Sequence, residues 1–192
     1  MRFAFWNLMF AFGGVVPTGI FALFAVVAFL ERRAWRVAAS WPLCLLIAIA
    51  IGTATKVVYY GWGVEYGFVR FHGFSGHTLR AAAVYPAFAY ALLAGSSRLR
   101  VFGGMIIGSL IAGMVLIGAV HNGIHSFAEA LAGAVTGAIA AVAICRSGQL
   151  PPLRGFTQIL IVTCACLLWI ALPPFRFDLE QVVVDFSARF RH

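Results

Sequence analysis

Two short polar segments in an otherwise apolar chain carry residue types that can act on a charged substrate. The first, "FHGFSGH", ends in Ser75, Gly76 and His77, directly before a long apolar run. Free backbone N–H groups at the start of a helix bind anions, and glycine lets a ligand approach the backbone closely. The pattern predicts an anion site at the start of a helix, with an imidazole beside it that can exchange protons.

The second segment, "HNGIHSFAE", places His121, His125 and Glu129 at successive intervals of four. If this segment begins a helix, the three side chains lie roughly along one face. A carboxylate one turn from an imidazole fixes its tautomer and stabilises its cationic form. Ionisable groups are costly to bury in a membrane, so we expect these residues to have a function.

Further basic residues flank the two segments. Lys56 lies where the second expected helix ends, so an orientation anchor at the interface is its alternative interpretation. Arg70 and His72 come just before Ser75, and Arg80 comes one turn after His77. Together they predict a cationic environment around the histidines.

The elements that position these residues are helices in a membrane. Of the 192 residues, 62% are hydrophobic and only 10% are charged, which is far from the composition of a soluble domain. A spanning helix needs about 20 mostly apolar residues. We therefore expect an all-α integral membrane protein, one domain over residues 1–192 with six transmembrane helices. Their expected ranges are about 8–30, 38–55, 79–96, 101–120, 127–145 and 156–173.

The distribution of arginine predicts the orientation. Six helices leave both termini on one face, and the loops at 31–36, 96–100 and 146–154 on the other face carry seven arginines and one glutamate. The positive-inside rule puts those loops in the cytoplasm and the histidine segments outside. The net charge of +8 is explained by this topology and by anionic headgroups, so no nucleic-acid partner is expected. The tail at 175–192 is either an interfacial helix or a frayed end.

These residues resemble a known family, the type 2 phosphatidic acid phosphatases, which are membrane lipid phosphatases related to the vanadium haloperoxidases. The family pattern reads Lys, six residues, Arg-Pro; then Pro-Ser-Gly-His; then Ser-Arg, five residues, His, three residues, Asp. Lys56 matches the start of the first part, and "FSGH" at 74–77 matches the second apart from its proline. "HSFAEALAG" at 125–133 resembles the third. The resemblance implies the six-helix fold of that family.

The chain also departs from the pattern. Gly63 stands where the first motif has arginine, and Gly118 with Ala119 stands where the third has Ser-Arg. Glu129 replaces the aspartate, a mild chemical change. Two phosphate-binding arginines are thus absent from their family positions. The residues that could replace them are Arg70, His72, Arg80, His121 and Asn122.

Carried over position by position, the resemblance implies that His125 is the nucleophile and forms a phosphohistidine, and that Glu129 orients it. His77 would be the general acid and then the base that activates water. The implied phosphate-binding groups are Lys56, Ser75, Gly76 and one or more of Arg70, Arg80 and His121. No metal or cofactor is required by this scheme.

The implied substrate is a membrane lipid phosphate or pyrophosphate of prenyl, glycerophospholipid or lipid A type. The implied location is a bacterial-type inner membrane, with the bilayer as partner and the site on the outer face.

Three alternatives remain open from the sequence. The same fold could transfer the phosphoryl group to a lipid or sugar acceptor instead of water. His121, His125 and Glu129, completed by His72 or His77, could instead bind a divalent metal. A degenerate member could bind a lipid headgroup without turnover, as the two missing arginines suggest.

Overall fold

A computed structural model describes residues 2–63, 71–145, 150–172 and 179–190. These residues form helices only, and no strand occurs among them. The helices are α1 (Arg2–Ala11), α2 (Val15–Glu31), α3 (Trp35–Trp62), α4 (Gly76–Leu93), α5 (Arg98–His121), α6 (Phe127–Cys145), α7 (Gly155–Ala171), α8 (Leu179–Ser187) and the 3-10 turn η1 (Ala188–Phe190). The expectation of an all-α chain is confirmed.

The first expected helix, 8–30, is wrong as a single element. The chain instead forms α1 and α2, which are bent by 48° at the residues between them. Gly13 and Gly14 are poor helix formers, and Gly14 is extended where it precedes α2. Pro17 lies in the first turn of α2, where its missing N–H breaks no helical bond.

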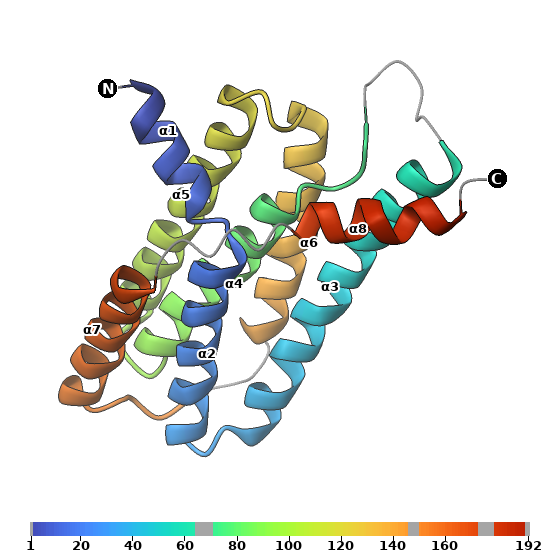
Figure 1. The fold of residues 1–192 in the computed structure, drawn as a ribbon. Helices are drawn as coiled ribbons and strands as arrows, with labels where there is room; N and C mark the ends of the chain where they lie inside the picture. Colours follow the sequence, from blue (N-terminus) through green and yellow to red (C-terminus); the bar gives the residue numbers. More distant parts are fainter. Residues whose placement is uncertain (1, 64–70, 146–149, 173–178, 191–192) are drawn as a thin grey trace.

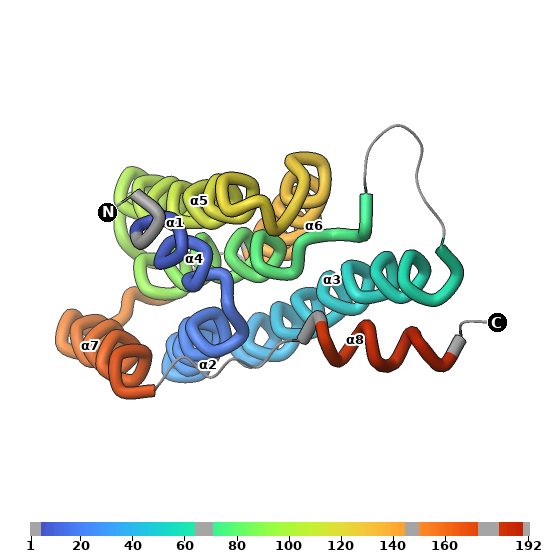
Figure 2. Tube along the Cα trace, turned by 45° about the horizontal axis from the view of Figure 1, so that its top comes forward, coloured from blue at the N-terminus to red at the C-terminus, as the bar shows by residue number. Residues whose placement is uncertain are grey.

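Helix α4 is the centre of the bundle. Of its 18 residues, 13 are buried, and it packs against α2, α3, α5 and α6. Figure 2 shows α4 between α5 and α6 on one side and α2 and α3 on the other. Because protein covers it on all these sides, α4 needs less apolar surface than a helix that faces lipid.

Glycines let the flanking helices approach α4 at backbone distance. A Cβ added at Gly108 of α5 would lie 2.6 Å from the carbonyl oxygen of Tyr85. On α6, Gly133 lies directly against the carbonyl of Ser75, and Gly137 lies against that of Leu79. Small residues at helix contacts are the usual means of close packing in membrane proteins.

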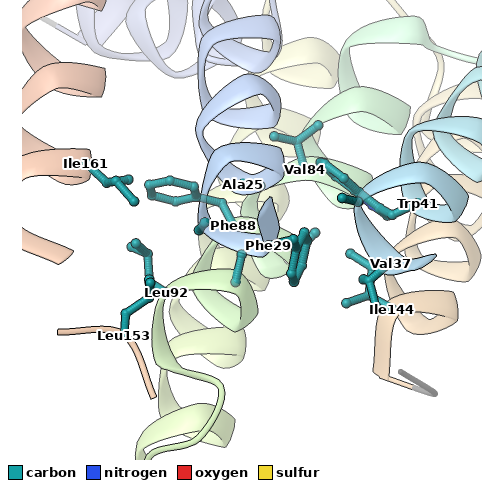
Figure 3. Close-up of a cluster of buried hydrophobic side chains, with 14 residues drawn as sticks. Ala25, Phe29, Val37, Trp41, Val84, Phe88, Leu92, Ile144, Leu153 and Ile161 are labelled. Carbon is teal, nitrogen blue, oxygen red and sulfur yellow. The ribbon is translucent and has the colours of Figure 1, made fainter. Parts of the chain in front are cut away.

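The other end of the bundle is filled by apolar side chains. Figure 3 shows Phe29 of α2, Trp41 of α3 and Phe88 of α4 in one cluster, closed by Ile144 of α6 and Ile161 of α7. Trp41 is 1% exposed and Phe29 is fully buried. This cluster fixes the helices at the end opposite to the polar segments.

Apolar side chains also cover the outside of the bundle. Leu46 of α3, Leu110 of α5 and Ile139 of α6 are each more than 60% exposed. By length and composition, α3, α5 and α6 can each cross a membrane, and the bent pair α1 and α2 would make a fourth span. Exposed apolar surface of this extent identifies a membrane protein.

Figure 1 shows the two polar connections, after α3 and after α5, at the same end of the bundle. The connections from α2 to α3 and from α4 to α5, which carry arginines, lie at the opposite end. The tail helix α8 packs against α3. Residues 175–178, 191 and 192 of the expected interfacial tail lie outside the described residues.

Candidate active site

The first polar segment ends as the N-terminus of α4. Ser75 is the N-cap residue and is fully buried. The segment is held on both sides, because the Phe74 N–H donates to Thr55 Oγ1 at 3.0 Å and Thr78 Oγ1 donates to the Ala130 carbonyl at 2.9 Å. The hydroxyl of Ser75 has no hydrogen-bond partner among the described residues. A buried hydroxyl and the free N–H groups of the first turn therefore meet at one place.

Glu129 joins the two polar segments. Its Oε2 accepts the Ser126 N–H at 2.9 Å, while the Glu129 N–H donates to Ser126 Oγ at 3.3 Å, which is a capping box at the start of α6. Its Oε1 accepts the N–H of His72, and its carbonyl accepts the N–H of Ser75 at 3.1 Å. The side chain is only 3% exposed. One residue thus fixes both segments in place.

His125 contacts the same carboxylate. Its Nδ1 lies 3.3 Å from Glu129 Oε2, and His125 is 8% exposed. With Nδ1–H facing the carboxylate, the lone pair is on Nε2. The conditional alignment of His121, His125 and Glu129 along one helix face does not hold, because α5 ends at His121 and α6 begins at Phe127, as expected for the fifth helix. The contact between His125 and Glu129 forms across the α6 cap instead.

Lys56 lies inside α3, which continues six residues further to Trp62. It is 8% exposed, so its interpretation as an anchor at the helix end is wrong. Gly73, at φ +113°, presses against it: a Cβ there would lie 2.7 Å from Lys56 Cγ. Only glycine readily adopts that backbone conformation. The first polar segment therefore packs directly over Lys56.

His77 lies in the first turn of α4, within electrostatic range of Arg80, His125 and Lys56. Its ring stacks on Phe10 of α1, with centroids 4.0 Å apart and an interplanar angle of 26°. Two imidazoles and two cationic side chains thus converge near the α4 N-terminus.

Arg80 is 8% exposed and turns back toward the start of its own helix. Nε and Nη2 donate to the carbonyl oxygen of Gly13 at 3.2 and 3.0 Å. Nη1 lies beside Gly76, where an added Cβ would be 3.0 Å from it. Gly76 is thereby the point where the α4 N-terminus and the guanidinium meet.

The remaining expected residues lie at the edge of this group. The His72 side chain is 48% exposed, its Nδ1 lies 3.7 Å from Glu129 Oε1, and its ring lies against Tyr59. His121 is exposed at the end of α5, with its ring 5.4 Å from that of Trp6. Arg70 lies outside the described residues. In the described part of the chain no three His, Cys, Asp or Glu side chains are grouped as metal ligands, so the metal alternative gains no support.

Sequence reasoning missed the contribution of α1. Phe10 contacts His77, and Gly13 supplies the carbonyl that holds Arg80. Gly118, where the family has serine, would place a Cβ 3.0 Å from the Trp6 carbonyl. The backbone of α1 thus occupies the space that a larger side chain would need. The pair Gly13-Gly14 indicates a break in the helix, but it does not indicate the direction in which α1 turns.

Comparison with known proteins adds one relative. No family model matches the chain, and no solved structure matches it. The chain is 32% identical over 139 residues to a protein of Klebsiella pneumoniae described as "Uncharacterized 22.5 kDa protein in cps region". The match covers 69% of this chain and 64% of the relative, which is less than two thirds of the relative's length. It names no activity.

Proposed function

We propose that this protein is a membrane lipid phosphatase of the type 2 phosphatidic acid phosphatase kind, which hydrolyses a lipid phosphate or pyrophosphate through a phosphohistidine. The observation that carries the proposal is the contact of His125 Nδ1 with the buried carboxylate of Glu129, beside the N-terminus of α4. A carboxylate in that position makes Nε2 the nucleophilic nitrogen and stabilises the charge that develops on the ring.

In the first step, His125 Nε2 attacks phosphorus, a P–N bond forms and the P–O bond to the lipid breaks. His77 donates its proton to the leaving oxygen. In the second step, His77 takes a proton from water, the water oxygen attacks phosphorus and the P–N bond breaks. Inorganic phosphate leaves, and His125 and His77 return to their starting states. A lipid pyrophosphate would react in the same way, with the lipid monophosphate as the leaving group.

The charge of the transferring phosphoryl group needs donors around it. The hydroxyl of Ser75, the first N–H groups of α4, Arg80 Nη1 and Lys56 are the groups best situated for this. Arg80 reaches the α4 N-terminus from within the helix, so it is our candidate for one of the two arginines that the family pattern has elsewhere. Arg70 is the second candidate on the sequence.

The proposal includes a six-span topology, in which α4, α7 and the bent pair α1 and α2 also cross the bilayer. The site then lies at the outer face of an inner membrane, with both termini on that face. Its support is the separation of the histidine segments from the arginine connections at opposite ends of the bundle (Figure 1). The lipid chain would enter from the bilayer while its phosphate meets the polar segments.

The test is phosphate release from a panel of lipid phosphates and pyrophosphates by the purified full chain. We expect release by the wild type, and its loss in His125→Ala and in His77→Ala. His192→Ala is the matched control, since it removes the histidine that lies outside both polar segments. Folded wild-type protein that releases no phosphate from any member of the panel would contradict the proposal.

Two further arms separate the alternatives. With lipid or sugar acceptors added, a phosphotransferase forms a new phosphorylated product at the expense of free phosphate. A second candidate function is lipid binding without turnover, which is motivated by Gly118 and Ala119 standing where the family pattern has Ser-Arg. In that case lipid phosphate binding survives in His125→Ala while the wild type shows no turnover.

A further inference from the structure

The break between α1 and α2 is bonded at each of its three carbonyl groups. Tyr85 Oη of α4 donates to the Phe12 carbonyl at 2.6 Å, and Arg80 of α4 donates twice to that of Gly13. Thr18 Oγ1 of α2 donates to the Gly14 carbonyl at 2.6 Å. In a membrane, carbonyls released from a helix must find such partners. Two of the three carbonyls are therefore held by α4, the helix that begins the site, and the third is held by α2 itself.

These bonds bring α1 against His77. Gly13 has no room for a side chain, because a Cβ would lie 2.8 Å from both His77 Cβ and the His77 carbonyl oxygen. One turn earlier, Phe10 covers a face of the His77 ring at 4.0 Å. Stacking at this distance restricts rotation of the imidazole and excludes water from that face.

The same residues fix Arg80. Its Nε and Nη2 share one carbonyl, that of Gly13, and this two-point contact sets the plane of the guanidinium. The third nitrogen, Nη1, is then directed to Gly76. Without the Gly13 carbonyl in this position, the long side chain of Arg80 has many other conformations.

We propose that α1 is part of the active site, with Phe10 positioning the ring of His77 and the Gly13 carbonyl positioning Arg80. The catalytic meaning of this inference rests on the proposed phosphatase function. Neither residue touches the reacting atoms, so both are positioning residues. A misplacement of about 1 Å at a reacting group costs on the order of 100-fold in rate, which gives the scale of the expected effects.

The first experiment is independent of activity. The full chain, labelled at histidine and held in detergent micelles, is studied by NMR, with the His77 ring signals assigned through His77→Ala. We expect these signals to move in Phe10→Leu, because the ring current of Phe10 is lost. They stay in place in Phe102→Leu, the same substitution at an exposed position of α5. Unchanged His77 signals in Phe10→Leu would overturn the inference.

The second experiment measures phosphate release. Phe10→Leu should lower kcat on the order of tenfold to 100-fold with little change in KM, because it misorients His77 without removing a phosphate donor. Gly13→Ala should raise KM as well, since it also displaces Arg80. Gly19→Ala is its control: it makes the same change in α2, with open space around the added methyl group.

The two experiments separate the two proposals. If the wild type releases no phosphate, the proposed function fails, and the NMR signals of Phe10→Leu still decide whether α1 positions His77. If the wild type is active and Phe10→Leu keeps the wild-type kcat, the inference fails and the proposed function stands. Because Gly13→Ala can disturb folding, the results for Phe10→Leu decide whether α1 positions His77.

Discussion

Two buried arginines lie at opposite ends of α4, and each binds backbone carbonyls, but with different consequences. Arg32, in the connection from α2 to α3, uses its two terminal nitrogens on the carbonyls of Ala91, Leu92 and Ala94. Arg80, near the start of α4, binds one carbonyl and keeps Nη1 beside Gly76. Both residues are 8% exposed, so burial does not distinguish them.

The difference lies in what each end of the helix needs. The last carbonyls of a helix lack partners and carry partial negative charge, so a guanidinium there satisfies them. Burial lowers the pKa of Arg32 to about 10, which still leaves it cationic at neutral pH. The first turn instead offers N–H groups and partial positive charge. The cationic Arg80 is unfavourable beside that partial charge unless an anion also binds there. Positive charge gathered in this way is typical of an anion-binding site.

Among the substitutions that test this difference between the two ends of α4, the one at Arg80 should have the largest effect, and that effect is on activity. Arg80→Gln keeps an N–H donor and removes the charge, so phosphate release should fall on the order of 100-fold to 1,000-fold, the scale for losing one donor to a developing oxyanion. The measurement is kcat/KM with a lipid phosphate. Activity equal to that of the wild type would remove Arg80 from the site.

The next effect is on stability, at Arg32. Arg32→Ala removes the arginine donor from the Ala91 and Ala94 carbonyls at the end of α4, while the Leu92 carbonyl keeps Gln158, and each unsatisfied buried group costs about 1–3 kcal/mol. We expect a lower thermal midpoint in detergent, with kcat per folded molecule unchanged. A variant that keeps its midpoint but loses turnover would reverse the roles assigned to the two ends.

The smallest effect is at Gln158 of α7, whose Nε2 donates to the Leu92 carbonyl at 2.9 Å. Arg32 also binds that carbonyl, so Gln158→Ala removes one of two donors and should cost only about 0.5–1.5 kcal/mol. The loss should be greater when Arg32 is already alanine, and a double-mutant cycle on the unfolding free energy measures this. If the two losses in unfolding free energy simply add, Arg32 and Gln158 are not coupled through the Leu92 carbonyl.

The sequence predicted the parts of this protein that depend on local pattern. Helix α6 begins and ends as expected, α5 and α7 differ by a few residues, and Ser75 does precede the first turn of a helix. The spacing of four between His125 and Glu129 also predicted their contact. Each of these follows from apolar run length or from geometry within one turn.

The rest depends on long-range contacts that leave no periodic signal. The turn of α1 is set by Arg80 and Tyr85, more than sixty residues away in the chain. Lys56 appeared to end its helix because a charge usually marks the interface, yet the chain folds Gly73 over it and α3 continues. His121 shares a spacing with His125 but not a helix, because "HNGIH" contains a helix end.

The carboxylate of Glu129 has two roles. It forms the capping box with Ser126 that begins α6, and in the proposed chemistry it orients His125. A related chain that had lost its turnover would still need the glutamate to begin α6 and to tie down the segment before α4. Its presence in another sequence is therefore weak information about activity. Arg80 is equally ambiguous, because its two hydrogen bonds to the Gly13 carbonyl also hold the break between α1 and α2. Under the proposed function, His77 is therefore the position that best distinguishes active from inactive relatives.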